Sequence, residues 1–483
     1  MKVAIAYPPL ESKKGVPLLS QNRQFQWFKV STYIYPVIPA YAATMLNNTG
    51  HQILWLDGIV ENLSFSLWLK KLKKFNPDLV FIETKTPVVK LHWQIIKKIK
   101  DSINCKVILA GDHVTALPFE SFNNSLVDYI LTGGDFDFLL LNLAEHLDKK
   151  IKLEPGIFYK KDKKIITTGK FKLNHNLNSL PFINRDLTKW QLYAFKNGNF
   201  KKTPGAYTMA GRDCWHRLNG GCAFCSWTSL FPSWRFRKPE LLVNEIGLLI
   251  KNCQIKTVFD DTGTFPISNF LKKFCQLMIK KGYNQKIDFS CNMRFGACSL
   301  KDYKMMKKAG FRMILFGLES ANQKTLDKIN KNIKVKQVVK SCQQAKQAGL
   351  EPHLTIMLGY PWETKADILR TIQLGTTLLK KGYADSLQAT LVIPYPGTLL
   401  FKQAKNKGLI KTFDWNKYDM KQPILKTKIK DEQLLKMIQD IYKVAFNPQF
   451  ILRKMLAIKS INDLKYYFSA GKKVLGHIAD FKK

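Results

Sequence analysis

Three closely spaced cysteines are the residues whose type and spacing point most clearly to chemistry. Cys214, Cys222 and Cys225 lie in GRDCWHRLNGGCAFCSW (211–227) and give the spacing C-x7-C-x2-C. Three thiolates, one short of four, can hold a cubane iron–sulfur cluster while leaving one iron without a protein ligand. A small molecule that chelates this open iron can receive an electron from it. The spacing therefore predicts a [4Fe–4S] cluster, with these three cysteines as its metal ligands and as catalytic residues.

Two other interpretations of these cysteines stay open at this point. A structural zinc site needs four ligands, and His216 is close enough in sequence to complete one. The three could also be small core residues, as we expect for the six cysteines scattered through apolar surroundings, at positions 105, 253, 275, 291, 298 and 342. Nine cysteines in a chain of this size do not indicate a disulfide framework.

The segments that would position the cysteines predict a partial parallel barrel over residues 203–400. Amphipathic stretches such as 239–252 and 336–349 alternate with β-rich segments at 206–211, 257–263, 286–294, 312–320, 352–360 and 386–395. Six β/α repeats, short of the full eight, predict an incomplete TIM-type (β/α)6 barrel. Chemistry in such barrels lies at the carboxyl ends of the strands, and the cysteine segment follows the first strand.

Further motifs stand where the later strands are expected to end. They are FDDTGTF (259–265), CNMR (291–294), GLES (317–320), LGYPWET (358–364) and IPYPGT (393–398). Each is weak alone, but in this order behind three cysteines they resemble the radical S-adenosylmethionine (SAM) superfamily. The resemblance covers residues 1 to about 450 and is to the branch with an N-terminal cobalamin-binding domain. The first cysteine spacing departs from the common C-x3-C-x2-C of that superfamily by four residues.

The resemblance implies that SAM binds at these strand ends. Phe224 matches an aromatic residue whose backbone contacts the adenine, and Glu319 and Ser320 match polar positions near the ribose and carboxylate. The family's Gly-Gly-Glu motif, which contacts the methionine amine, is replaced here by Asp260, Asp261, Thr262 and Gly263. Further implied cofactor contacts are Arg294, Gly359 and Pro361.

The reaction implied by the resemblance is one-electron cleavage of SAM to methionine and a 5′-deoxyadenosyl radical, which abstracts hydrogen from an unactivated carbon. With cobalamin as methyl carrier, the enzyme would be a methyltransferase acting on a small molecule or lipid. A radical cyclase or oxidative rearrangement, as in the anaerobic tetrapyrrole cyclases, is the alternative. A non-catalytic protein that binds cobalamin or nucleic acid is a third. An electron donor such as ferredoxin or flavodoxin is an expected partner.

Residues 1–150 alternate short strands and helices in the manner of a Rossmann-like doubly wound parallel sheet. The resemblance implies that cobalamin binds at its carboxyl edge, with Asp112, His113 and Thr115 in AGDHVTALP (110–118) and Gly133 and Gly134 in LTGGD (131–135) as contacts. Asp-x-His-x-x-Gly, the pattern of an axial histidine, is missing, so His113 is not expected to bind cobalt. A degenerate domain that binds nothing is the alternative. Residues 151–202 predict a hairpin (156–169) and a linker.

The amino-acid composition limits which kinds of partner the protein is expected to bind. The net charge of +41 comes from 67 Lys and only 10 Arg, spread along the chain. Proteins that read nucleic acid favour Arg, so a solvated lysine-rich surface is expected and specific nucleic-acid binding is not. The absence of an apolar run of about 18 residues excludes an ordinary membrane-spanning helix, and a cytoplasmic protein is expected. The helical, basic region 401–483 is expected to close the barrel mouth with its basic face near an anionic membrane surface or substrate, and packing of its aromatic residues onto the barrel is the alternative.

Overall fold

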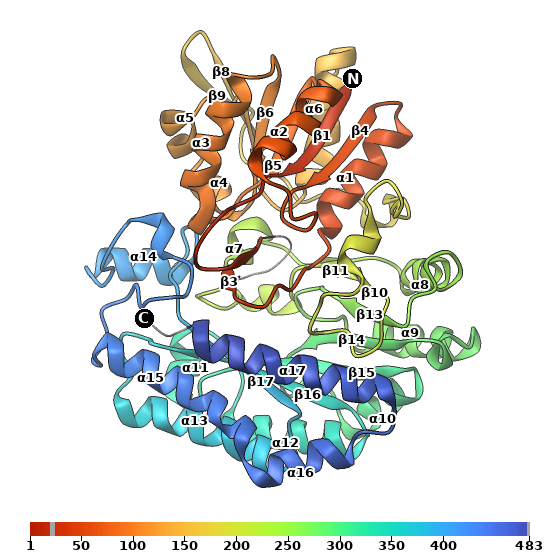
Figure 1. Cartoon of the computed structure of the whole chain (residues 1–483), viewed down its shortest axis with the longest axis vertical. Coiled ribbons are helices and arrows are strands. Elements are labelled where there is room, and N and C mark those ends of the chain that lie inside the picture. Colours follow the sequence, from red (N-terminus) through yellow and green to blue (C-terminus); the bar gives the residue numbers. More distant parts are fainter. Residues whose placement is uncertain (20–24, 481–483) are drawn as a thin grey trace.

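The computed structural model describes residues 1–19 and 25–480, and it contains two large sheets (Figure 1). The first sheet has the order β4-β1-β5-β6-β7-β8-β9, and its first five strands are parallel. Its strands are β1 (Lys2–Tyr7), β4 (Gln52–Asp57), β5 (Leu79–Glu83), β6 (Lys106–Ala110), β7 (Tyr129–Leu131), β8 (Ile157–Lys161) and β9 (Lys164–Thr167). The predicted hairpin is β8–β9, and it extends this sheet as antiparallel strands.

Helices cover both faces of the first sheet, as the near-complete burial of β1, β5 and β6 requires. They are α1 (Val37–Asn48), α2 (Phe65–Phe75), α3 (Val89–Lys100), α4 (Asp112–Ala116), α5 (Pro118–Asn124) and α6 (Phe136–Lys149). The Rossmann-like prediction for this region is confirmed. At the end of β6, Gly111 has φ of +123°, and a Cβ there would lie 2.2 Å from the carbonyl oxygen of Thr84. Only glycine permits this approach of two strand ends.

The second sheet consists of six parallel strands in sequence order, which confirms the partial-barrel prediction. They are β10 (Gly205–Thr208), β13 (Thr257–Asp260), β14 (Asp288–Met293), β15 (Phe311–Glu319), β16 (Glu351–Leu358) and β17 (Ser386–Leu391). The helices between and after these strands include α8 (Pro239–Cys253), α9 (Asn269–Lys280), α10 (Leu300–Lys308), α11 (Gln323–Lys328), α12 (Val335–Gln347), α13 (Lys365–Lys380) and α14 (Leu399–Asn406). Among the described residues β10 and β17 do not pair with each other, so the barrel is open on one side.

The C-terminal region is helical, as expected. It contains α15 (Asp431–Tyr442), α16 (Pro448–Leu456) and α17 (Ile461–Asp480), dark blue in Figure 1. The segment before these helices contacts the first domain, where Trp415 Nε1 donates to Glu120 at 2.7 Å and Lys90 pairs with Asp414 at 2.9 Å. Near the N-terminus, β2 (Val16–Leu18) and β3 (Gln26–Phe28) form a small antiparallel ribbon between the two large sheets.

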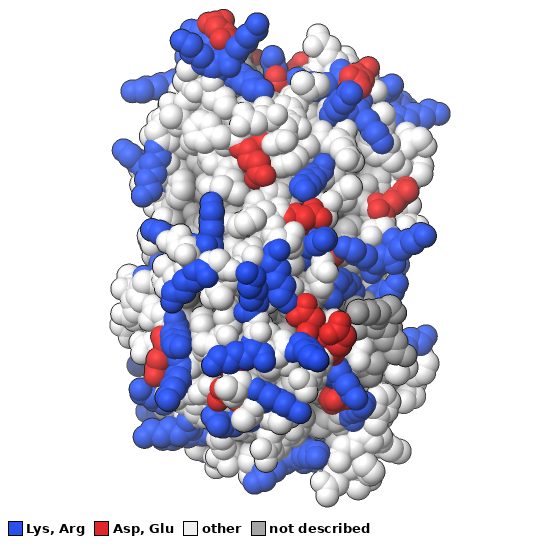
Figure 2. All heavy atoms as spheres, turned by 90° about the vertical axis from the view of Figure 1, so that its left-hand side faces the viewer, with Lys and Arg blue, Asp and Glu red and all other residues white. Residues whose placement is uncertain are grey.

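Basic side chains do not form a single patch on the face shown in Figure 2. Lysine and arginine are spread over the whole of that face, with aspartate and glutamate among them. This distribution agrees with a solvated lysine-rich surface. No helix within residues 1–19 and 25–480 has the length and apolar character needed to cross a membrane.

Candidate active site

The cysteine segment leaves the carboxyl end of β10 and folds back over the same edge of the sheet. β11 (Gly211–Arg212) pairs antiparallel with β12 (Arg235–Phe236), and a 3-10 helix (Trp215–Asn219) follows Cys214. Gly220 and Gly221 have φ of +82° and +72°, a left-handed conformation that favours glycine. The short helix and this turn occupy the seven residues between Cys214 and Cys222, which accounts for the long first spacing.

All three cysteines line one cavity of about 410 Å³, a volume in the range of small-molecule sites. Cys214 Sγ lies 2.9 Å from Thr264 Oγ1, and Arg294 Nη1 lies 3.8 Å from Cys222 Sγ. Among the described residues no three His, Cys, Asp or Glu side chains are grouped closely enough to hold a single metal ion. The thiolates of a [4Fe–4S] cluster each bind a different iron, so thiols spaced around one cavity fit that donor set.

Two glycines allow the loops of the site to come together. A Cβ at Gly263 would lie 2.7 Å from the backbone carbon of Asp213, so a glycine lets the FDDTGTF loop contact the cysteine loop. A Cβ at Gly221 would lie 2.0 Å from Arg217 Nη1. Arg217 fixes the cysteine loop from within, because its Nε donates to Asp213 and its Nη1 donates to Thr228 Oγ1 at 2.7 Å.

Positively charged side chains lie around Cys222. Burial raises the pKa of its thiol, and the nearby Lys331 and Arg294 act in the opposite direction. Because metal ligation requires the thiolate, these cations favour the form that binds metal. Burial also lowers the pKa of His216 to about 4, and its Nε2 lies 2.6 Å from the carbonyl oxygen of Asn330. The ring is therefore neutral, with its proton on the nitrogen that donates to this carbonyl.

Five of the residues predicted to contact SAM line the same cavity, namely Phe224, Asp261, Gly263, Arg294 and Glu319. Glu319 has φ of +61°, which is uncommon for a residue with a side chain. Its carboxylate accepts from Lys331 Nζ at 2.7 Å, and a Cβ at Gly317 would lie 2.4 Å from Glu319 Oε1. A strained backbone held by an ion pair beside a cavity is typical of functional sites.

The other predicted SAM residues lie outside this lining and hold the strand ends in place. Asp260 accepts from the Ala210 amide at 2.8 Å and from Thr208 Oγ1 at 3.0 Å, and Thr262 Oγ1 accepts from the Gly211 amide at 3.0 Å. Ser320 donates to Glu363 at 2.7 Å. The remaining two, Gly359 and Pro361, lie in the turn between β16 and α13, and Gly359 has φ of +100°.

Several cavity residues were not predicted from the sequence: Asn292, Lys331, His353, Gln388, Tyr442 and Lys473. Asn292 stands two residues before Arg294 near the end of β14, so its place in an expected strand could have indicated it. Its Nδ2 donates to the carbonyl oxygen of Thr262 at 2.9 Å. The others come from strand interiors, loops or C-terminal helices, where their types carry no recognisable spacing.

The predicted cobalamin contacts lie at the carboxyl edge of the first sheet, but this edge is covered. α7 (Trp227–Leu230) follows the cysteine loop, and the amide of Gly134 donates to the carbonyl oxygen of Leu230 at 2.8 Å. A Cβ at Gly134 would lie 1.9 Å from the Phe231 ring, and one at Gly133 would lie 2.4 Å from the Phe171 ring. The cavity beside Asp112 has a volume of about 10 Å³, room for about one water molecule.

His113 and Thr115 at this edge are satisfied by protein groups. His113 is buried, with Nδ1 3.2 Å from Thr86 Oγ1 and Nε2 3.1 Å from Glu120, and Thr115 Oγ1 accepts from the Gly133 amide at 3.1 Å. In this arrangement a corrin ring does not fit at the edge. Binding there would require α7 and Phe231 to move.

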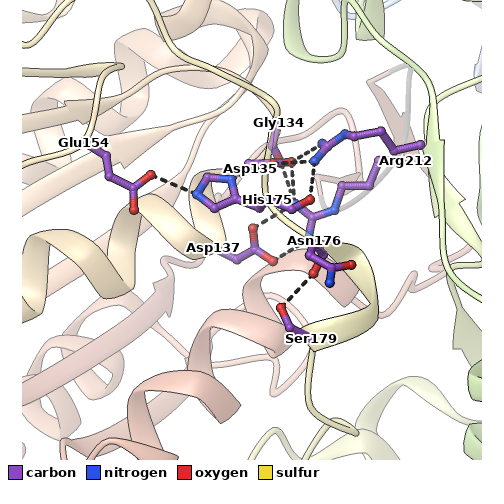
Figure 3. A network of polar contacts seen from close by, with 9 residues as sticks. Gly134, Asp135, Asp137, Glu154, His175, Asn176, Ser179 and Arg212 are labelled. Carbon is purple, nitrogen blue, oxygen red and sulfur yellow. Dashed lines mark hydrogen bonds and ion pairs between the residues drawn. The ribbon is translucent and has the colours of Figure 1, made fainter.

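A buried network of charges joins this edge to the cysteine loop (Figure 3). The Arg212 guanidinium, two residues before Cys214, points at the carboxylates of Asp135 and Asp137, and its Nη1 lies 2.8 Å from an oxygen of each. His175 lies between two carboxylates, with Nδ1 2.9 Å from an oxygen of Asp135 and Nε2 2.9 Å from an oxygen of Glu154. These ion pairs and hydrogen bonds raise the pKa of His175 to about 9, although its partial burial acts in the opposite direction. The network fixes the cysteine loop to the first domain.

Comparisons with known proteins agree with this geometry. The model of the radical SAM superfamily matches residues 211–375, which include the cysteine loop and the strand ends around the cavity. A protein of Pyrococcus horikoshii named as an uncharacterized methyltransferase is 29% identical over 467 residues, 95% of each chain. The anaerobic magnesium-protoporphyrin IX monomethyl ester cyclase of Cereibacter sphaeroides is 22% identical over 87% of this chain and 68% of its own.

Solved structures share this fold. The cobalamin-dependent S-adenosylmethionine radical enzyme OxsB, with aqua-cobalamin and S-adenosylmethionine bound, matches with a TM-score of 0.71 at 13% identity, over 99% of this chain and 71% of its own. The radical S-adenosylmethionine methyltransferase TsrM of Kitasatospora setae matches with a TM-score of 0.65 at 13% identity, over 84% and 75% of the two chains. Residues 211–375 therefore match a radical SAM domain, and the chain shares its fold with these two cobalamin-dependent enzymes.

Proposed function

We propose that this enzyme cleaves SAM by means of a [4Fe–4S] cluster bound by Cys214, Cys222 and Cys225, and that it transfers a methyl group to a carbon of its substrate. The observation that carries the proposal is the position of the three thiols in one cavity at the carboxyl edge of a parallel sheet. When bound, the cluster supplies the electron that cleaves SAM. The relative that matches 95% of the chain carries a methyltransferase name, which supports the reaction class.

The charged residues of the cavity have complementary roles in this proposal. SAM carries an amine and a carboxylate on its methionine part, and the cavity offers both signs of charge. Asp261 and Glu319 would accept hydrogen bonds from the amine and the ribose, and Arg294 would pair with the carboxylate. Phe224 would lie against the adenine. These groups would be positioned from behind by Asp260, Thr262 and Ser320 and by the turn at Gly359 and Pro361.

The walls of the cavity would exclude water from the reacting atoms. Val30, Thr32 and Ile34 of the N-terminal segment line it on one side, and Tyr466 and Val474 of α17 line it on another. A reactive radical needs such shielding, because water access permits side reactions. This arrangement supports the predicted lid function of the C-terminal region.

We further propose that cobalamin carries the methyl group, which the fold shared with OxsB supports. Asp112, His113, Thr115, Gly133 and Gly134 would contact it once α7 and Phe231 had moved from the edge. We also propose that the chain is divided at the limits predicted from its sequence. These regions are 1–150, 151–202, 203–400 and 401–483.

A radical cyclisation is the second candidate reaction, because relatives 22% and 24% identical are magnesium-protoporphyrin IX monomethyl ester cyclases. The reaction products distinguish methylation from cyclisation. Transfer of labelled methyl from SAM to the product supports methylation, whereas an unmethylated oxidised or cyclised product supports the alternative.

Anaerobic reconstitution with iron and sulfide tests the core of the proposal. Wild type should bind four irons and form 5′-deoxyadenosine from SAM when reduced by dithionite, or by ferredoxin or flavodoxin, the expected electron donors. Cys222→Ala should lose the cluster spectrum and the product, while Cys253→Ala, a half-buried cysteine on α8, should keep both. Full SAM cleavage by Cys222→Ala would refute the cluster assignment.

Contact with an anionic membrane surface is a further proposal, and it concerns α16 and α17. These helices expose the apolar side chains of Leu452, Met455, Leu456, Leu464, Phe468 and Leu475 among lysines. Apolar groups beside basic ones favour binding at an anionic lipid surface. Co-sedimentation should then require anionic lipid and weaken with salt, and equal binding to neutral vesicles would refute it.

A further inference from the structure

The last helix, α17, forms the wall of the cavity at the open side of the barrel. Tyr466, Ala470, Lys473 and Val474 line the cavity, and their spacing places them on one face of the helix. At its far end α17 meets the N-terminal segment, where a Cβ at Gly476 would lie 3.2 Å from Val30 Cγ2. Opposite α17, the inner face of the sheet contributes Met313, Leu315, Met357 and Leu387.

Lys473 places a half-buried amine on this wall. No acidic side chain that the structure describes forms an ion pair or hydrogen bond with its amine, although Lys201 pairs with Asp463 of the same helix at 2.9 Å. Burial lowers the pKa of Lys473. Because Lys473 is half-buried, an ammonium there is partly desolvated, and a ligand of opposite charge would offset that cost.

The amine lies close to a glycine of the cavity wall. Gly198 also lines the cavity, and a Cβ there would lie 3.1 Å from Lys473 Nζ. The same cavity has apolar lining residues, among them Val30 and Ile34 of the N-terminal segment and Met313 and Met357 of the sheet. The carboxylates of the cavity, Asp213, Asp261 and Glu319, lie with the cysteines at the strand ends.

We propose that Lys473 binds an anionic group, a carboxylate or a phosphate, of a substrate whose apolar body lies against Met313, Leu315 and Met357. The inference rests on the proposed function, because it places the substrate in the cavity that holds the three cysteines. It adds the substrate class, an amphiphilic anion, and assigns its recognition to the C-terminal helix. The ammonium supplies charge-assisted hydrogen bonds, which are stronger than neutral ones.

The test uses two fluorescent probes on the full-length protein without cluster. Anilinonaphthalenesulfonate carries an anionic group, and N-phenylnaphthylamine has the same aromatic body without it. Lys473→Met should weaken binding of the anionic probe about tenfold or more, because one charge-assisted contact is lost, and should leave binding of the neutral probe unchanged. Lys473→Arg should restore most of the affinity. The matched control is Lys472→Met, an exposed neighbour that lies over the Phe468 ring and should change nothing.

Displacement of the anionic probe compares charged with neutral competitors, and the stronger of the two charged ones identifies the preferred anion. Decanoate or decyl phosphate should compete in wild type and compete less in Lys473→Met, and decanol should compete equally in both. Equal affinity of wild type and Lys473→Met for the anionic probe would overturn the proposal, as would a parallel loss for the neutral probe or for Lys472→Met. Because the probes bind without cluster, this outcome is independent of whether the reconstituted enzyme cleaves SAM.

Discussion

The carboxyl edges of the two parallel sheets differ in what lies against them. In the first sheet, polar groups at the carboxyl ends bond to other protein groups, as Tyr7 does to Glu83 at 2.6 Å and Tyr193 to Asp57 at 2.7 Å. In the second sheet the corresponding edge opens into a cavity of about 410 Å³ lined by cysteines and charged residues. The difference arises from what packs on each edge: α7 and Phe231 fill the first, whereas the cysteine loop bridges the second.

This contrast shows that a polar residue at a strand end need not take part in chemistry, because protein contacts can occupy the same position. The same segment serves both edges, since the cysteine loop continues directly into α7. We therefore expect occupancy of one edge to affect the other. Substitutions at Arg212, Asp57, Gly263 and Phe231 would test how far the two edges differ.

The largest effect should follow from removing Arg212, which ties the covered edge to the cysteine loop. Arg212→Met leaves Asp137 buried without its partner, and breaking a buried pair costs about 3–5 kcal/mol of unfolding free energy. Urea denaturation measures this loss. Arg370→Met, which breaks an exposed pair with Asp367, should cost less than about 0.5 kcal/mol. Adding Asp137→Leu to Arg212→Met should recover part of the loss, and no recovery would contradict an electrostatic cause.

A pH-dependent effect should come from Asp57 at the covered edge. Its burial raises its pKa to about 6 in the folded state, above the ordinary 3.8. The folded protein then binds more protons than the unfolded chain between about pH 4 and 6, so this residue makes stability fall as pH rises through that window. The full effect is about 3 kcal/mol. Asp57→Asn should remove this slope from unfolding free energies measured from pH 4 to 7, and an unchanged slope would contradict the assignment.

At the open edge, Gly263→Ala should separate the two loops that form the cavity. The added Cβ would lie 2.7 Å from the backbone of Asp213 and 3.1 Å from the amide nitrogen of Cys214. A misplacement of about 1 Å in a reacting group can cost about 100-fold in rate, so we expect a loss of that order in 5′-deoxyadenosine formation. Gly471→Ala on α17, where nothing lies within 4 Å, is the control. Wild-type activity in Gly263→Ala would show that the loops need not touch.

The smallest effect should be on corrin binding. Phe231→Ala removes the ring that lies over Gly134 and should raise the affinity for hydroxocobalamin about tenfold, a gain of about 1.4 kcal/mol. Difference absorption spectroscopy measures the binding. Phe236→Ala, an exposed phenylalanine of β12, should leave it unchanged. Weaker binding by Phe231→Ala would indicate that the corrin does not use this edge.

Sequence patterns were sufficient where the signal is local. Alternation of apolar strands with amphipathic helices predicted both parallel sheets, and the three cysteines are recognised by spacing alone. The strand-end motifs were placed correctly at the edge, yet Asp260 and Ser320 point into the protein and bond to Thr208 and Glu363. Neighbouring residues of a strand end face opposite sides, and periodicity does not say which side holds the cavity.

Periodicity and residue chemistry were enough to predict the secondary structure, the order of the strands along the chain and the grouping of the three cysteines. Three other features are visible in the folded protein alone: Lys331 pairs with Glu319 beside the cysteines, Phe231 covers Gly134, and Lys473 faces the cavity. Each of these contacts joins residues whose meeting depends on how helices and loops pack around the sheets. Such packing sums many weak, non-directional contacts over the whole chain, so no short motif encodes it.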